Sequence, residues 1–310
     1  LRPSGIGGQA VLEGIMMKNK EKYSVAVRKP DGQIEVRTEV YRGIAGDSKW
    51  AKLPLIRGVV NFIDSLILGM ESLSYSASFY DDEEEQEPGK FEKLLVKLFG
   101  EKAEKVVMGC TVAFSVIMAV AIFMVLPYYI SGIFRNFIVS NTLLAVLEGV
   151  IRLGLFTLYV VLISCMKDIK RTYMYHGAEH KCINCIEHGL ELNVENVRKS
   201  SKQHKRCGTS FLFFVMIVSV IFCFFITAQS QVMRIVIRLA LLPLIAGVSY
   251  EIIKLAGNSD NPVVNLLSKP GMWVQNMTTK EPDDSMIEVA ICAVEKVFDW
   301  REWQEKNNEL

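Results

Sequence analysis

Residues 106–130 read VVMGCTVAFSVIMAVAIFMVLPYYI, and this apolar stretch decides the class of fold. It contains no charged residue, and it exceeds the roughly 20 apolar residues that carry a helix across the hydrocarbon core of a bilayer. A water-soluble protein would have to surround such a helix with core on every side. The stretch therefore predicts a transmembrane helix.

Three more apolar runs of similar length follow, at residues 142–166, 210–228 and about 232–255. The chain has 310 residues, is 50% hydrophobic and has a positive mean hydropathy. Apolar residues that concentrate in long runs are typical of membrane proteins. We expect a mainly α, polytopic helical membrane protein with about four transmembrane helices, two in residues 106–166 and two in residues 210–255.

The distribution of basic residues predicts the orientation of these helices. Residues 167–209, between the second and third runs, hold nine Lys or Arg residues, whereas the short connections at 131–141 and 229–231 hold only Arg135. Because basic loops stay on the cytoplasmic side, residues 167–209 and both termini are expected in the cytoplasm. Cysteines in that compartment are expected to be thiols rather than disulfides.

The first 80 residues form a separate N-terminal unit. Residues 23–41 alternate apolar and polar side chains around a Pro30-Asp31-Gly32 turn, which predicts a β-hairpin. Residues 53–79 predict an amphipathic or fully buried helix with charges at seven-residue spacing. Packing on the membrane surface, or as a re-entrant segment, is the favoured interpretation of that helix.

The remaining segments are polar or mixed in composition. Residues 81–105 predict an acidic linker followed by a short amphipathic helix. Residues 256–310 predict a cytoplasmic C-terminal segment that ends in a helix, with Asp283 or Asp284 as its N-cap. In the apolar runs, Glu148 and Arg152 are spaced to pair on one helix. Charges at that depth are typical of functional sites and equally of internal ion pairs.

All four histidines lie in one window of 29 residues, from His176 to His204. Residues 176–180 read HGAEH and fit H-x-x-E-H, the inverted zincin pattern. On a helix, His176 and His180 face the same side and can share one cation. Glu179 is placed to take a proton from a zinc-activated water. The pattern predicts a metal site with Glu179 as its catalytic base.

The third ligand must come from another segment, and several residues qualify by type. They are His204, Cys207, Glu187, Glu195 and Glu251.

Two other interpretations of the same region remain open. Cys182 and Cys185, followed by His204 and Cys207, have a spacing that suits a structural Cys₃His zinc site. A solvated helix with surface histidines and buried cysteines would bind no metal at all.

Five segments resemble one known family: GGQAVLEGIMM (7–17), YHGAEHK (175–181), VENVR (194–198), HKRCGTSF (204–211) and TTKEPDDSMIEVAI (278–291). The chain is similar to the YqhQ-like bacterial membrane proteins, which are often labelled predicted metal-dependent enzymes. The resemblance implies a protein of the bacterial cytoplasmic (inner) membrane with the histidine cluster at its centre. It also implies a set of site residues: Gln9, Glu13, His176, Glu179, His180, Glu195, Asn196, His204, Arg206, Cys207, Glu281, Asp283 and Asp284.

These observations lead to two main functional hypotheses. A third, a small-ion or metal transporter that uses Glu148, Arg152 and Glu251, is less favoured because the four spans show no repeats. In the first, a divalent metal, most simply zinc, activates water with Glu179 as base and hydrolyses an ester, amide or phosphoester at the inner leaflet. In the second, the protein is a non-enzymatic accessory or stabilising subunit of a membrane-protein complex, and its zinc is structural. The lipid bilayer is a partner in both. The net charge of +1 implies nothing about a nucleic-acid partner, but the absence of a polybasic stripe interleaved with aromatic residues argues against one.

Overall fold

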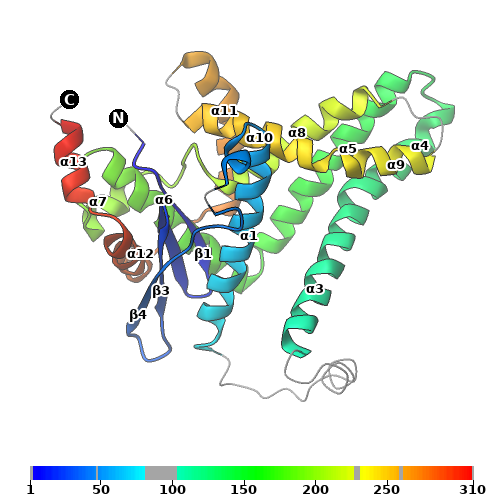
Figure 1. Cartoon of the computed structure of the whole chain (residues 1–310). Helices are drawn as coiled ribbons and strands as arrows, with labels where there is room; N and C mark the ends of the chain where they lie inside the picture. The colour runs from blue at the N-terminus through cyan, green and yellow to red at the C-terminus, as the bar shows by residue number, and fades with distance from the viewer. Residues whose placement is uncertain (1–2, 47, 81–102, 227–230, 258–260, 309–310) are drawn as a thin grey trace. The chain divides into compact units, whose positions relative to one another are not determined.

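The computed structural model describes residues 3–46, 48–80, 103–226, 231–257 and 261–308 (Figure 1). The chain divides into two compact units. The first unit comprises Leu1–Tyr80, Val160–Phe222 and Arg238–Leu310, and the second comprises Asp81–Tyr159 and Cys223–Ile237. The predicted acidic linker, and all but the last residues of the short helix after it, lie outside the described residues. The structure is mainly helical with an N-terminal antiparallel sheet, as expected.

The first unit contains a four-stranded antiparallel sheet with strand order β1-β2-β3-β4. Its strands are β1 (Ile6–Val11), β2 (Gly14–Asn19), β3 (Lys22–Arg28) and β4 (Ile34–Val40). The predicted hairpin is confirmed as β3 and β4, with Arg28 opposite Ile34. Strands β1 and β2 were not predicted, because their glycines and their lack of alternation resemble a loop.

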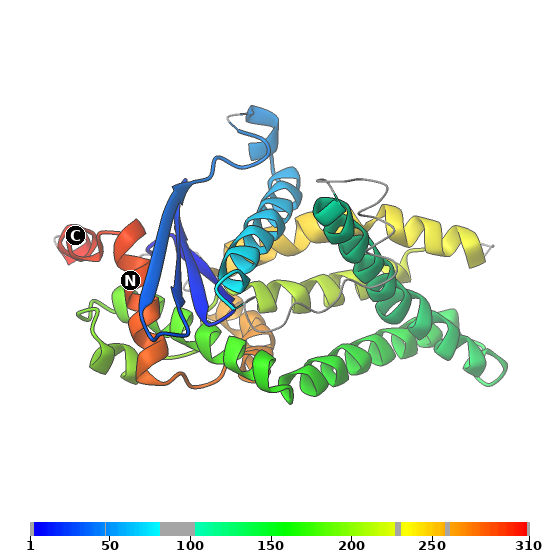
Figure 2. The same cartoon turned by 90° about the horizontal axis from the view of Figure 1, so that it is seen from below.

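Helices cover both faces of this sheet, as Figures 1 and 2 show. Side chains alternate along a strand, so Ile15, Met17 and Ala26 point towards α6 (Lys167–Glu187) and α12 (Asp284–Val297). Met16, Val25 and Val27 point the other way, towards α1 (Ile56–Ala77). Burial on both sides explains why Gly14–Met17 is apolar throughout.

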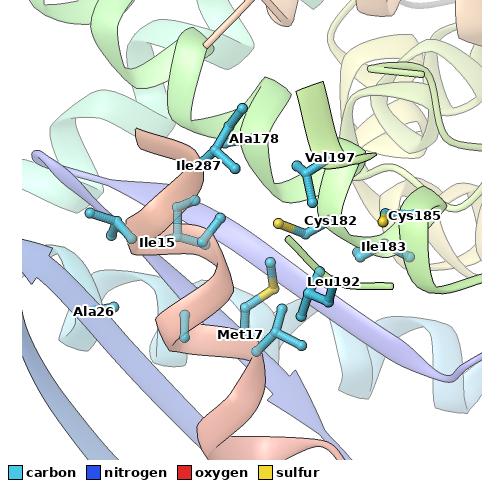
Figure 3. Packing of buried hydrophobic residues seen from close by; sticks show 14 of the residues in the cluster. Ile15, Met17, Ala26, Ala178, Cys182, Ile183, Cys185, Leu192, Val197 and Ile287 are labelled. Carbon is cyan, nitrogen blue, oxygen red and sulfur yellow. The ribbon is translucent and has the colours of Figure 1, made fainter. Parts of the chain in front are cut away.

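The main core lies between the sheet, α6 and α12 (Figure 3). Tyr175, Ile183 and Ile287 are almost completely buried there, and each such apolar side chain stabilises the fold by about 1.5–3 kcal/mol. The predicted helix cap is confirmed, since the Asp283 carboxylate accepts a hydrogen bond of 3.0 Å from the backbone N–H of Met286.

The remaining helices complete the fold. They are η1 (Lys49–Lys52), α7 (Val194–Lys199), α8 (Gly208–Phe224), α9 (Gln231–Ala240), α10 (Leu242–Gly257), α11 (Pro262–Thr278) and α13 (Trp300–Asn308). Most of them belong to the first unit.

Two helices among the described residues are long and apolar enough to cross a membrane. They are Gly109–Asn136 and Thr142–Ser164. The first begins within α3 (Ala103–Val120) and continues through a π-helical turn η4 (Ala121–Val125), α4 (Leu126–Ile133) and η5 (Phe134–Asn136). The second lies within α5 (Asn141–Ser164). Within α5, Arg152 donates to Glu148 at 2.8 Å, and both side chains are buried.

The other two predicted spans differ from expectation. The third run forms α8, which has 17 residues and is too short to meet the same length criterion among the described helices. The prediction of one continuous fourth helix is wrong, because the run breaks at Leu241 between α9 and α10. Pro243, in the first turn of α10, has no N–H to extend the hydrogen-bond ladder of α9. Among the described residues, two helices are therefore candidate spans, where the sequence predicts four.

Candidate metal centre

Helix α6 presents two imidazole rings on one face. His176 and His180 are four residues apart, and their ring centroids are 4.4 Å apart. The helical spacing predicted from H-x-x-E-H is therefore confirmed. The helix is central to the first unit, because its other faces pack against the sheet and α12.

Cys207, directly before α8, brings a sulfur atom to the same place. Its Sγ lies 3.3 Å from Nε2 of His176. The ligating atoms of His176, His180 and Cys207 all lie within 4.8 Å of one another. In the part of the chain that the structure describes, no other group of three His, Cys, Asp or Glu residues meets this condition.

In His176 and in His180, the ring nitrogen Nδ1 forms a hydrogen bond with a main-chain oxygen. Nδ1 of His176 donates to the carbonyl of Thr278 at 2.9 Å, and Nδ1 of His180 donates to the carbonyl of Lys202 at 2.7 Å. A carbonyl can only accept, so each Nδ1 carries a proton and each Nε2 is left to face the cluster. Metal-binding histidines commonly show this arrangement, in which a carbonyl fixes the tautomer and the ring orientation.

Electrostatics couple the sulfur to the nitrogens. Burial acts to lower the pKa of His176, but the adjacent Cys207 sulfur outweighs burial and raises that pKa to about 9. Burial acts to raise the pKa of Cys207, but His176 and His180 outweigh it and hold that pKa well below its usual value. The lowered pKa of Cys207 favours the thiolate form of its side chain. The thiolate is the form that binds metals.

The segment that leads to Cys207 is held against α6 by main-chain contacts. Lys181 Nζ donates to the carbonyls of Arg198 and Ser200, both at 2.9 Å. Asn184 Nδ2 donates to the carbonyls of Ser201 at 2.7 Å and Gln203 at 2.9 Å. Side chains of α6 therefore fix the end of α7 and the path of residues 200–203, which have no regular secondary structure.

Gln275 of α11 fixes the next residue of this segment. Its Oε1 accepts from the backbone N–H of His204 at 2.9 Å, and its Nε2 donates to the carbonyl of His204 at 2.8 Å. Nε2 also donates to Ser210 Oγ at 2.7 Å, and the side chain is completely buried. Sequence reasoning missed Gln275, because an isolated glutamine in a helix carries no signal of its distant partner.

Glu179 lies beside the cluster rather than in it. The residue is 5% exposed, and its Oε2 has no hydrogen-bond partner among the described residues. A Cβ added at Gly8 of β1 would approach the Glu179 carboxyl carbon to 3.0 Å, so glycine lets this side chain lie against the strand. A buried carboxylate oxygen without a partner is costly, and a nearby cation would offset that cost.

His204 points to a different partner than expected. Its Nε2 lies 3.4 Å from Glu187 Oε2, and the residue is not part of the three-donor group. Glu187 also accepts from Ser4 N and Oγ, both at 2.7 Å, and pairs with Arg206. Burial acts to raise the pKa of Glu187, but the bond with His204, the Arg206 charge and the Ser4 donors lower it to about 2.

Cys182 and Cys185 belong to the hydrophobic core, as Figure 3 shows. Burial raises the pKa of Cys182 well above its usual value and that of Cys185 to about 11. Cys185 Sγ lies 3.4 Å from the carbonyl of Glu191. Neither thiol joins Cys207 in the donor group. The Cys₃His site expected as an alternative is not formed, because these thiols lie on the core side of α6.

Two acidic residues that the sequence predicted as site residues bind side chains of α6 instead. Glu13, in the β1–β2 turn, pairs with Arg171 and accepts from Tyr175 Oη at 3.2 Å. Glu281, just before α12, pairs with Lys181 at 2.8 Å. Both contacts orient the helix that carries the histidines.

The other predicted site residues lie outside the cluster and have their own partners. Gln9 packs against Gly69 of α1. Glu251, a candidate third ligand, pairs with Arg57 and does not join the histidines. Glu195 pairs with Lys199 on the surface, Asp284 pairs with Arg198, and Asp283 caps α12. Asn196 is held by Asn193, which caps α7.

Fold and site together define a mainly helical protein with two apolar helices and a largely buried His–His–Cys cluster on a helix that packs against a small sheet. The chain belongs to the family described as Protein of unknown function (DUF1385), whose model matches residues 53–300. It is 33% identical over 312 residues to "Uncharacterized protein YqhQ" of Bacillus subtilis (strain 168), covering 98% of this chain and 96% of that protein. The YqhQ-like resemblance is thereby confirmed. No solved structure matches the chain.

Proposed function

We propose that this protein is a metal-dependent hydrolase of the bacterial cytoplasmic membrane. His176, His180 and Cys207 would hold the ion, and Glu179 would act as general base. The observation that carries the proposal is the pair of Nδ1–carbonyl bonds, which leaves both Nε2 atoms available to the cluster, where Nε2 of His176 lies 3.3 Å from the Cys207 sulfur. Two imidazoles and a thiolate favour zinc over magnesium or calcium, which prefer oxygen donors.

The number of donors favours catalysis over a purely structural role. Structural zinc sites have four protein ligands, whereas catalytic sites have three and keep one position open. The described residues supply three donors here. A bound zinc ion would supply a water molecule with a pKa near 7 and a Lewis acid for a carbonyl or phosphoryl oxygen.

Glu179 and His176 have complementary positions for such a reaction. Glu179 keeps Oε2 free of hydrogen-bond donors, so that oxygen can accept a proton from an attacking water. His176 is half-buried while His180, Cys207 and Glu179 are buried, so a substrate would approach from the His176 side. Two apolar helices in the same chain favour an ester, amide or phosphoester substrate at the membrane surface.

The basic residues of the first unit support a cytoplasmic position for the centre. Nine Lys or Arg residues lie between positions 167 and 209, which follow the second candidate span directly. The positive-inside rule places such a segment in the cytoplasm.

A structural zinc ion in a subunit of a larger membrane complex is the second candidate. The observation in its favour is that the donors and their carbonyl partners come from three segments remote in sequence: α6, residues 202–207 and Thr278. An ion there would join these segments, and its protein donors are largely shielded from water.

Metal analysis tests the site itself. The full chain, purified in detergent, should contain about one zinc per chain, and His176→Ala, His180→Ala or Cys207→Ser should each remove most of it, since three donors share the ion. His188→Ala is the matched control, because His188 is exposed and bonds only to the carbonyl of Asn184 in its own helix. Equal metal content in all four variants would overturn the site.

Cobalt substitution separates the two candidate functions. With Co²⁺ in place of zinc, added azide should change the visible spectrum of an open catalytic site and leave a closed structural site unchanged. Glu179→Gln should retain the metal and abolish metal-dependent cleavage of p-nitrophenyl esters and phosphates. A spectrum that azide does not change would reject the hydrolase and leave the structural ion.

A further inference from the structure

Helix α1 (Ile56–Ala77) has one exposed apolar face that extends from Ile56 to Leu73. From Phe62 to Leu73 the exposed apolar side chains recur at intervals of three and four residues, and Ile56 lies on the same side of the helix. They are Ile56, Phe62, Ile63, Leu66, Ile67, Met70 and Leu73. A contiguous apolar surface of this size on a folded unit indicates contact with a protein or a membrane.

The opposite side of α1 carries all of its charges, and each charge has a partner in the first unit. Arg57 pairs with Glu251 of α10, and Glu71 lies 3.8 Å from Arg37 of β4. Asp64 accepts from Tyr41 Oη at 2.9 Å and from the backbone N–H of Ile44 at 2.8 Å. The charged side chains of α1 thus bind partners on other segments of the first unit, and the apolar face of α1 carries no charged residue.

The N-terminal half of α1 borders, on its charged side, a cationic cavity of about 210 Å³. Four basic side chains line the cavity against two carboxylates: Lys18, Lys20, Arg42 and Lys52 against Glu21 and Asp64. Just before the helix, Trp50 is 56% exposed and Leu53 is 52% exposed. Exposed tryptophan beside lysines is typical of the membrane–water interface, and clustered basic residues attract anionic lipids.

We propose that α1 lies in the plane of the membrane surface. Its apolar face contacts the acyl chains, and its basic N-terminal end binds the head groups of anionic phospholipids. At 1.5 Å per residue the helix is about 33 Å long, but it cannot cross the bilayer, because the charged outer strand β4 packs beside it. Amphipathic helices in this situation lie along the interface. Charge complementarity with the basic cavity selects an anionic bilayer as the occupant.

Photocrosslinking tests which molecule covers the apolar face. The full chain, with benzoylphenylalanine at Leu66, is reconstituted in vesicles of equal parts phosphatidylcholine and phosphatidylglycerol. Ser65 is the matched control, because it is exposed on the polar side of the same helix, one residue away. Lipid adducts are expected at Leu66 and at least severalfold fewer at Ser65. Predominant adducts to protein at Leu66, or equal lipid labelling at both positions, would overturn the proposal.

Charge reversal tests the head-group preference. With the probe at Leu55, phosphatidylglycerol adducts should exceed phosphatidylcholine adducts. Each lysine near an anionic surface contributes about a fivefold preference, so Lys20→Glu with Lys52→Glu should abolish the excess. Lys296→Glu, on the exposed side of α12, should leave it intact. An excess unchanged by the double variant would refute the basic end as the lipid site.

The lipid surface is independent of the proposed metal centre. Zinc content measured in the same samples should be unchanged by the charge reversals. Loss of lipid contact with normal zinc would reject only the lipid surface, and absence of zinc with normal lipid contact would reject only the metal centre.

Discussion

At the scale of single residues, the candidate centre depends on bonds from side chains to main-chain oxygens. His176 and His180 each use Nδ1 in this way, and Lys181 and Asn184 hold the segment that leads to Cys207. The three atoms that could bind an ion are therefore already held close together. Such preorganisation reduces the conformational entropy lost on binding.

Glu187 provides a pH-dependent test of this network. Its folded pKa of about 2 is below the ordinary value of 4.5, so its bonds stabilise the fold fully above pH 4.5. That stabilisation is lost as the pH falls from 4.5 to 2. The thermal midpoint of the wild type should exceed that of Glu187→Gln at neutral pH, and the difference should disappear towards pH 2.

Glu195→Gln is the control for this experiment. Glu195 forms an exposed pair with Lys199, and exposed pairs contribute little to stability. Thermal midpoints measured from pH 2 to pH 7 should show a much smaller difference for this variant. A Glu187→Gln deficit that persists at pH 2 would show that the carboxylate is not the source of the stabilisation.

At the scale of elements, helix α6 and the segment before α12 meet at their backbones. A Cβ at Gly177 would lie 2.0 Å from the carbonyl oxygen of Lys280. The backbone N–H of Lys280 also donates to the carbonyl of Tyr173 at 2.9 Å. Glycine at position 177 therefore sets how close Thr278 comes to His176.

Gly177→Ala should separate these two elements. In an unobstructed helix, alanine in place of glycine stabilises by about 0.5–1 kcal/mol. Here we expect a loss of about 1–3 kcal/mol from the clash, together with reduced zinc content. Gly154→Ala in α5 is the control, because no atom lies within 4 Å of its added Cβ. Urea or thermal unfolding would measure both, and equal stability of the two variants would contradict the close contact.

At the scale of the whole molecule, the two units should respond differently to zinc. All three donors and both carbonyl partners lie in the first unit. A ligand that binds only the folded state stabilises it by about 2.7 kcal/mol at 100 times its dissociation constant. Hydrogen exchange of the full chain should therefore slow in residues 173–187, 202–207 and 278–282 when zinc is added.

Residues 142–159 of α5 belong to the second unit and serve as the internal control. Their exchange should change little, because no proposed donor lies among them. Equal slowing in both units would mean that zinc acts on the molecule as a whole, and no slowing in α6 would argue against binding there.

Local patterns predicted those features that depend on neighbours in the chain. The β3–β4 hairpin, helix α1, the Asp283 cap and the spacing of His176 and His180 all follow from contacts within a few residues. The choice of Cys207 over His204 or Cys182 as the third donor did not follow, because it depends on how residues 198–207 cross α6. The sequence analysis did not predict the break between α9 and α10, because it relied on the high hydropathy of the run and gave too little weight to Pro243.

The sequence by itself determined that the chain has long apolar helices, a separate N-terminal sheet region and one histidine-rich segment with helical spacing. These properties arise from composition and periodicity, which act locally. Only the tertiary structure decided that strands β1 and β2 exist, that Cys182 lies in the core, and that Gln275, Thr278 and Lys202 orient the cluster. Such outcomes depend on which segments, distant in the sequence, pack against each other and on which buried polar groups then need hydrogen-bond partners. A local sequence pattern contains no information about either.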